Sequence, residues 1–352
     1  MSSYHQEQER KNKLKLREIE AELPPFMNEF FRNRADHTSS RTRLGYAYDM
    51  RLFFNYLRTD TFEFGGKTVH NFTLEDMGKI TNYHIEEFLD YLSVYNKGGD
   101  GKDIWVENRM EGKSRKLSAI RSVFAYFYKR GKVAANPAEL VDTPPTKEKA
   151  KVYLDVDEIA NLIDMADHGV KMTNHQKKFH TFTRSRDVAL LSLFSGTGIR
   201  ISECVGLNIE DIDLKKGSFK VTRKGGNEEI LHFNEEIEKA LQEYLDERML
   251  KKPLPGHERA LFLSIQNRRI TDRAVQNLVK KYSQMSNSLK TITPHKLRTS
   301  FGTNMYRQTG DIYLVADLLG HKDVNTTRKN YADTKQDAGR RAVRNLRLRG
   351  DD

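Results

Sequence analysis

A charged stretch with two adjacent prolines, at residues 141–151, divides this chain of 352 residues into two parts. It reads VDTPPTKEKAK and has few apolar side chains with which to enter a hydrophobic core. That composition is typical of a linker between domains. The chain is also longer than one typical core requires. We therefore expect two domains, joined by a linker at residues 141–152.

The part before the linker has the spacing of amphipathic helices. We expect these helices at residues 1–23, 25–34, 40–58, 82–95 and 114–130. The first is highly charged and ends before two prolines, so we interpret residues 1–24 as an N-terminal arm. The other four predict a helical domain at residues 25–140. The predicted capping residues are Ser39 or Ser40, Thr81 and Ser114 at helix starts and Gly131 at a helix end.

Basic side chains collect on the polar faces of two of these helices. The whole chain carries 60 Lys and Arg against 49 Asp and Glu, and its pI of about 9.4 favours a polyanionic partner such as nucleic acid. A basic helix face can lie against phosphates, although a solvated surface has the same pattern. The candidate DNA contacts on these helices are Arg41, Arg43, Arg51, Arg115, Lys116 and Arg121.

The part after the linker, residues 153–334, combines helices with a β-hairpin. The helical pattern resumes at Asp155, and residues 219–222 and 229–233 flank a glycine-bearing turn. The fold class is therefore mainly α, with a small β-hairpin or sheet. The single cysteine, Cys204, can form neither an internal disulfide nor a zinc site by itself, and its helical setting predicts a packing role.

The sequence indicates a cytoplasmic protein with no membrane partner. Its first residues, MSSYHQEQERKNK, are polar and unlike a secretion signal. The longest nearly continuous apolar run, residues 188–194, is much shorter than the roughly 20 residues that cross a bilayer.

Six side chains of the second part form a set suited to phosphate chemistry. They are Arg200, Lys224, His295, Arg298, His321 and Tyr331. Breaking a phosphodiester requires positive charge at the non-bridging oxygens, a nucleophile, and a proton for the leaving oxygen. Arginine suits the first role because its planar fork holds two oxygens and stays charged. The set contains no carboxylate, so it predicts DNA strand cutting by the protein's own tyrosine, without a metal or another cofactor.

Local sequence predicts how two of these side chains are presented. Thr293 can cap a helix whose first turn contains Pro294. His295 and Arg298, three residues apart, then project from the same face of that helix. The positive end of the helix dipole adds to the attraction for an anion.

Arg200 lies in a glycine-bearing segment, residues 195–203, which reads SGTGIRISE. The glycines suggest a tight helix start. No Gly-Lys-Ser or Gly-Lys-Thr follows them, which argues against an ATP site. Glu203, one turn beyond Arg200, is placed to orient the arginine.

The motifs of the second part, taken in order, resemble those of the tyrosine recombinases, the phage integrase family. They are Thr-Gly-x-Arg-x-x-Glu at 197–203, a lysine in a glycine-bearing hairpin at 224, Pro-His-x-Leu-Arg at 294–298, Leu-Gly-His at 319–321 and Thr-Thr-x-x-x-Tyr at 326–331. The resemblance extends over residues 25–345. It implies a helical, SAM-like core-binding domain and a catalytic domain, which together form a C-shaped DNA clamp.

The resemblance also implies a role for each matching side chain. Tyr331 attacks the phosphate and leaves a 3′-phosphotyrosine and a free 5′-hydroxyl, while Arg200 and Arg298 bind the non-bridging oxygens. Lys224 protonates the leaving oxygen. The two histidines complete the set: His295 takes part in proton transfer with the tyrosine, and His321 donates a hydrogen bond to the phosphate.

Two features depart from the family pattern or extend it. Arg223 directly precedes Lys224 in the hairpin, so it competes for the lysine's role and is a further candidate DNA contact. Residues 335–352 form a basic tail, which the resemblance suggests docks on a neighbouring protomer; a disordered tail has the same composition.

The favoured interpretation is a recombinase that acts on double-stranded DNA with short inverted core sites. It acts as a homotetramer or together with a related recombinase. Several alternatives stay open beside it. A type IB topoisomerase-like nicking and closing enzyme shares the chemistry, and a DNA-binding protein with a vestigial site shares the scaffold. Aspartates at 311, 317, 323 and 333 prompt a metal nuclease, but we interpret them as helix caps and surface charges. Within the recombinases, a Xer-like enzyme is favoured over a mobile-element integrase. Either enzyme acts on DNA, so we expect the protein to be associated with the nucleoid.

Overall fold

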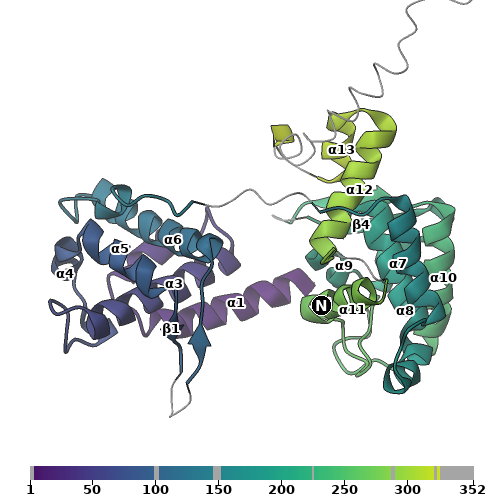
Figure 1. Cartoon of the computed structure of the whole chain (residues 1–352), viewed down its shortest axis with the longest axis horizontal. Coiled ribbons are helices and arrows are strands. Elements are labelled where there is room, and N and C mark those ends of the chain that lie inside the picture. The colour runs from purple at the N-terminus through teal and green to yellow at the C-terminus, as the bar shows by residue number, and fades with distance from the viewer. Residues whose placement is uncertain are drawn as a thin grey trace, which may run out of the picture. The chain divides into compact units, whose positions relative to one another are not determined.

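The computed structural model describes residues 4–98, 103–145, 152–223, 226–286, 290–320 and 323–325. The chain divides into two compact units, Met1–Lys149 and Ala150–Asp352. Both are built mainly from helices, with short antiparallel strands, as Figure 1 shows. This confirms the mainly α fold class that the sequence predicts. The predicted tail at 335–352 and part of the linker lie outside the described residues.

In the part that the structure describes, the first unit consists of six helices and a short hairpin. The helices are α1 (Tyr4–Glu20), α2 (Met27–Asn33), α3 (Ser40–Asp60), α4 (Leu74–Lys79), α5 (Asn82–Tyr91) and α6 (Met110–Lys129). Strands β1 (Tyr95–Asn96) and β2 (Trp105–Val106) pair antiparallel. Two single 3-10 turns, Val69–Asn71 and Pro137–Glu139, complete the unit.

Aromatic side chains fill the core of the first unit. Phe53 on α3 meets Phe88 on α5 with ring centroids 5.0 Å apart, and both are fully buried. Edge-to-face pairs of this kind add to the stabilisation from apolar burial. Leu16 and Ile19 of α1 belong to the same core. The C-terminal half of α1 is therefore part of this unit's packing, where we expected an appended arm.

At the helix starts of the first unit, the predicted capping residues are found at two of three positions. Ser39 caps α3 by accepting a hydrogen bond from the backbone of Thr42, and Thr81 caps α5. The prediction of Ser114 as a cap is wrong, because α6 begins one turn earlier, at Met110, without a side-chain cap. Tertiary contacts hold that extra turn in place: Lys113 is buried and its Nζ donates to Ser93 Oγ at 2.6 Å.

The described residues of the second unit form seven helices and a three-stranded sheet. The helices are α7 (Val156–His168), α8 (Asn174–Thr197), α9 (Ile201–Gly206), α10 (Glu235–Leu250), α11 (Asp272–Met285), α12 (Pro294–Thr309) and α13 (Ile312–Leu318). The strands are β3 (Ile212–Asp213), β4 (Ser218–Thr222) and β5 (Glu228–His232), in antiparallel order β3-β4-β5. Strands β4 and β5 are the predicted hairpin, with Thr222 paired to Glu228 at the turn.

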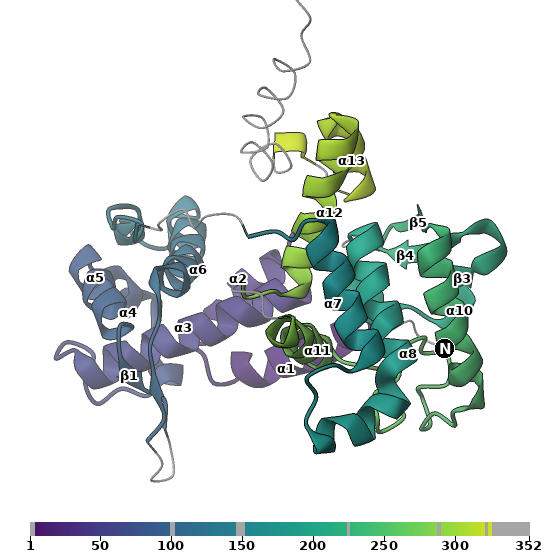
Figure 2. The same ribbon diagram turned by 45° about the vertical axis from the view of Figure 1, so that its right-hand side comes forward.

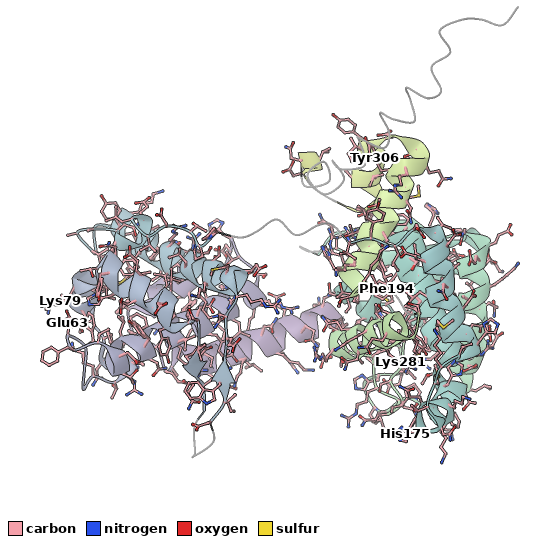
Figure 3. The ribbon with its side chains drawn as sticks, viewed as in Figure 1. Glu63, Lys79, His175, Phe194, Lys281 and Tyr306 are labelled. Carbon is pink, nitrogen blue, oxygen red and sulfur yellow. The ribbon has the colours of Figure 1, made fainter. Side chains whose placement is uncertain are left out.

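Helix α8 is the central element of the second unit. It packs against α7, α10 and α12, which surround it in Figure 2. Residues 189–194, in its C-terminal half, are all buried, and Phe194, labelled in Figure 3, is one of them. Cys204 on α9 is fully buried, which confirms its packing role. None of the described helices is long and apolar enough to cross a membrane.

Candidate active site

Arg298 lies in the second turn of α12. The helix starts as the sequence predicts: Thr293 Oγ1 accepts from the backbone N–H of Lys296, and Pro294 occupies the first turn. The Arg298 guanidinium is buried, and its two terminal nitrogens donate to the carbonyls of Gly198 and Leu319. These bonds fix the guanidinium between two segments distant in sequence.

Gly198 allows these segments to approach closely. It has a φ of +62° and ends α8, and a Cβ added there would lie 2.5 Å from Phe301 Cδ1. Glycine is the residue that accepts both the left-handed backbone and this contact. The prediction that a helix starts at these glycines is therefore wrong. Gly198 ends α8, and the next helix, α9, begins at Ile201.

Arg200 stands at the N-cap of α9, beside the buried Glu203. Its Nη1 donates to Glu203 Oε1 at 2.8 Å, and its backbone N–H donates to Glu203 Oε2 at 3.0 Å. This confirms that Glu203 orients the arginine. The remaining terminal nitrogen, Nη2, donates to the carbonyl of Gly320 at 3.1 Å. About a third of the Arg200 side chain is exposed, so it remains open to an anion from solvent.

The two arginines thus meet at one turn. Arg298 binds the carbonyl of Leu319 and Arg200 binds the carbonyl of the next residue, Gly320. The turn has a left-handed residue at Gly320, with a φ of +58°. Three motifs therefore form one cluster, although the first and the last are more than 100 residues apart in the sequence. They lie around residues 198–203, 294–298 and 319–320.

His295 lies one turn before Arg298 on α12, in the first turn of the helix. The residue keeps an exposed surface. The pKa of His295 lies below its ordinary 6.5. The larger cause is partial burial of the ring, and the smaller is repulsion from the charges of Arg298 and Arg200. The imidazole is therefore neutral near pH 7 and can accept a proton.

Arg223, at the end of β4, is buried in the same cluster. Its Nε and Nη2 donate to the two carboxylate oxygens of Glu229 at 2.7 and 3.0 Å, and its Nη1 donates to Glu203 Oε2 at 3.0 Å. The bond from Arg223 lowers the pKa of Glu229, against a smaller opposing effect of burial. The sequence analysis did not predict this ion pair. The signal for it was the pair of opposite charges, Arg223 and Glu229, on the two sides of the hairpin turn.

The structure brings together three of the six predicted site residues: Arg200, His295 and Arg298. The other three, Lys224, His321 and Tyr331, lie outside the described residues. Two of the four aspartates that prompted a metal nuclease are caps or turns: Asp311 accepts from the backbone of Tyr313 and Leu314, and Asp323 from that of Asn325. Within the described ranges, no group of three or more His, Cys, Asp or Glu side chains is arranged to hold a metal ion.

Most candidate DNA contacts of the first unit have partners within the chain. Arg51 pairs with Glu22 at 2.6 Å, and Arg115 Nη2 donates to the buried Asp49 at 2.7 Å. Lys116 is not on the outer face of α6 as expected; it is buried, and its Nζ donates to Asn108 at 2.7 Å. The same-chain bonds do not test the DNA contacts, which stay predictions.

The remaining three candidates on these helices differ in exposure. Arg41 is exposed and Arg43 is half-buried. Arg121 donates to the backbone carbonyls of Ala138 and Val141 and, at 2.7 Å, to the hydroxyl of Thr143. It thereby fastens the start of the linker to α6.

Comparison with known proteins connects this arrangement to one family. Residues 153–337 match the Phage integrase family. A tyrosine recombinase XerC of Thermodesulfovibrio yellowstonii is 35% identical over 254 residues, which cover 69% of this chain and 81% of the relative. Another, of Caldanaerobacter subterraneus subsp. tengcongensis, is 31% identical over 317 residues, 86% of this chain and 82% of the relative.

Solved structures share the fold. The XerH site-specific recombinase bound to a palindromic difH substrate, in a post-cleavage complex, matches with a TM-score of 0.61 and 20% identity over 88% of this chain and 81% of that one. The Tn1549 transposon integrase in complex with transposon right end DNA matches with a TM-score of 0.61 and 21% identity, over 91% and 97%. Sequence and fold agree, and the chain belongs to the phage integrase family of tyrosine recombinases.

Proposed function

We propose that this enzyme is a site-specific recombinase that cuts and rejoins DNA strands through a 3′-phosphotyrosine on Tyr331. The observation that carries the proposal is the convergence of Arg200 and Arg298 on consecutive carbonyls of the turn at residues 319–320. Two guanidiniums fixed at one place supply the positive charge that a phosphate needs in the transition state. The predicted His321 follows directly in the sequence.

In the proposed reaction, the Tyr331 hydroxyl attacks the phosphorus and the bond to the 5′-oxygen breaks. Arg200 and Arg298 bind the non-bridging oxygens, and His321 donates a hydrogen bond to the phosphate. His295, neutral near pH 7, serves in proton transfer with the tyrosine, and Lys224 gives the leaving 5′-oxygen its proton.

The arginines offset a real handicap of tyrosine as a nucleophile. With an ordinary pKa of about 10, a tyrosine is roughly one-thousandth ionised at pH 7, which corresponds to about 4 kcal/mol. Removal of one oxyanion donor costs about 3–4 kcal/mol in comparable sites. Because the phosphotyrosine keeps the energy of the phosphodiester, a second DNA end reverses the step without ATP or a metal ion.

The proposed substrate is double-stranded DNA with short inverted core sites, and the proposed active form is a homotetramer or an assembly with a related recombinase. The matched structures support the DNA substrate, since one is a recombinase bound to a palindromic difH substrate and the other is an integrase in complex with transposon right end DNA. The net charge of +11 supports a polyanionic partner. We place this Xer-like or mobile-element activity in the cytoplasm, at the nucleoid.

Capture of a covalent adduct tests the proposal. Duplexes with a randomised inverted-repeat core and a nick that lets a short strand diffuse away are incubated with the full chain in EDTA. We expect protein–DNA adducts that survive SDS, and sequencing their DNA over successive rounds identifies the core site. Tyr331→Phe should form none.

Two outcomes would contradict the proposal. One is the absence of any adduct with the wild-type chain over all rounds. The other is an undiminished adduct with Tyr331→Phe, which would mean that another side chain is the nucleophile.

A further inference from the structure

The Arg223 guanidinium joins three separate elements of the second unit. It donates to Glu229 on β5 through two nitrogens and to Glu203 on α9 through the third. Glu203 in turn holds Arg200 at 2.8 Å. The Arg223 side chain is only 8% exposed, so these charge-assisted bonds form in a setting with little competing water.

The third element is the turn at Gly320. A Cβ added to Gly320 would lie 2.8 Å from Cζ of Arg223 and 2.9 Å from its Nε and Nη2. Real Cβ atoms do not approach other atoms this closely, so the guanidinium is packed directly against the glycine backbone. The same glycine carbonyl accepts from Arg200. Arg223 and Arg200 therefore contact one residue, and both bind one carboxylate.

This placement separates Arg223 from the two roles that its sequence position suggests. Every nitrogen of its guanidinium already donates to a protein carboxylate, and the group is buried. A proton donor or a DNA contact needs to face the substrate. A group that ties a strand, a helix and a turn together instead fixes their relative positions.

We infer that Arg223 is a positioning residue: packed beneath Gly320 and bound to Glu203 and Glu229, it holds the Arg200 guanidinium and the 319–320 turn in register for the phosphate. The chemical part of this inference rests on the function proposed above. The packing part stands on its own, because it concerns only the contact between Arg223 and Gly320.

Single-turnover adduct formation tests the positioning role, on the core site recovered as described above. Arg223→Ala should slow adduct formation about tenfold to one-hundredfold, the range expected for losing charge-assisted bonds, and change DNA affinity by less than about threefold. Arg223→Lys should recover little of the rate, because one ammonium cannot span Glu203 and Glu229 together.

A sulfur substrate separates positioning from proton donation. In a duplex with a 5′-bridging phosphorothiolate, the leaving thiolate needs no proton. The loss caused by Arg223→Ala should be the same on sulfur and oxygen substrates, whereas the loss caused by Lys224→Ala should shrink on sulfur. A loss at Arg223 that sulfur relieves would make Arg223 the proton donor and overturn the inference.

The glycine contact has a matched control elsewhere in the unit. Gly310 has a φ of +70° with open space around its Cβ position, so Gly310→Ala carries the backbone strain without the collision. Gly320→Ala should lower the unfolding temperature more than Gly310→Ala does, and this excess should shrink in the Arg223→Ala background. Strictly additive effects would show that the contact does not exist.

The outcomes distinguish the inference from the proposed function. A wild-type chain that forms no adduct overturns the function, and the positioning role with it. An active wild type with an equally active Arg223→Ala overturns the positioning role alone.

Discussion

Glu203→Gln removes the charge that holds two arginines in the candidate site while keeping the shape of the side chain. The carboxylate is buried and accepts three hydrogen bonds: from Nη1 of Arg200 at 2.8 Å, from the backbone N–H of Arg200 at 3.0 Å, and from Nη1 of Arg223 at 3.0 Å. Glutamine can keep one accepting oxygen. Its amide nitrogen then faces the N–H groups of a guanidinium, and one of the two arginines loses its hydrogen bond to residue 203.

The size of the effect follows from these contacts. Breaking a buried ion pair by removing one partner costs about 3–5 kcal/mol. Arg200 is about a third exposed, so solvent screens its share, and an amide oxygen at the Oε2 position preserves two of the three bonds. We expect Glu203→Gln to lower the free energy of unfolding of the second unit by about 2–4 kcal/mol. For a unit of this size that is roughly 5–15 °C in unfolding temperature.

Calorimetry of the full chain measures this change, with Glu243→Gln as the matched control. Glu243 pairs with Arg184 in the same unit, but 48% of its side chain is exposed, so its loss should cost about 0–1 kcal/mol. Adduct formation by Glu203→Gln should also fall, because Arg200 is no longer held. A thermal shift no larger than that of the control would refute the reasoning, since it would mean that the buried carboxylate contributes little.

Three further predictions follow from particular contacts. Gly198→Ala should destabilise the second unit by about 1–3 kcal/mol more than Gly310→Ala in urea titrations, because both carry left-handed strain but only the first collides with packed side chains. Partial burial and two neighbouring arginines lower the pKa of His295, so the folded chain binds fewer protons there than the unfolded chain. The free energy of unfolding should therefore decline as pH falls below about 6.5. His295→Gln should remove that part of the decline, as measured by urea titrations at a series of pH values. Arg41→Gln should weaken DNA binding and reduce the slope of affinity against salt by about one, as measured by fluorescence anisotropy, because Arg41 is exposed.

Sequence predicts best the features that depend on neighbours in the chain. The start of α12 follows from Thr293 and Pro294 alone, and the β4–β5 hairpin from its turn and flanking residues. The same local reasoning failed at Ser114, because buried contacts made by Lys113 extend α6 toward its N-terminus. Helix boundaries respond to tertiary packing that a capping residue does not reveal.

In the candidate site, too, the sequence predicts the residues but not the contacts that depend on packing. Its arginines could be named from motifs, but their shared turn at residues 319–320 could not, since it depends on how α8, α9 and α12 pack. Arg223 shows the limit most clearly. As a residue beside the predicted Lys224 it suggested a competitor or a DNA contact, and only its two carboxylate partners show that its charge is used within the protein.

The bonds of Arg121 at the start of the linker set a limit on the reach of the chain between the two units. Thr143 is fastened to α6 by Arg121, and the carbonyl of Tyr153, ten residues further on, accepts from Lys290 in the second unit. A fully extended chain spans roughly 3.3–3.6 Å per residue, so these two anchors can never be more than about 35 Å apart. Any DNA that both units hold must be compatible with this short tether, and inserting residues between the anchors would lengthen it without touching either unit.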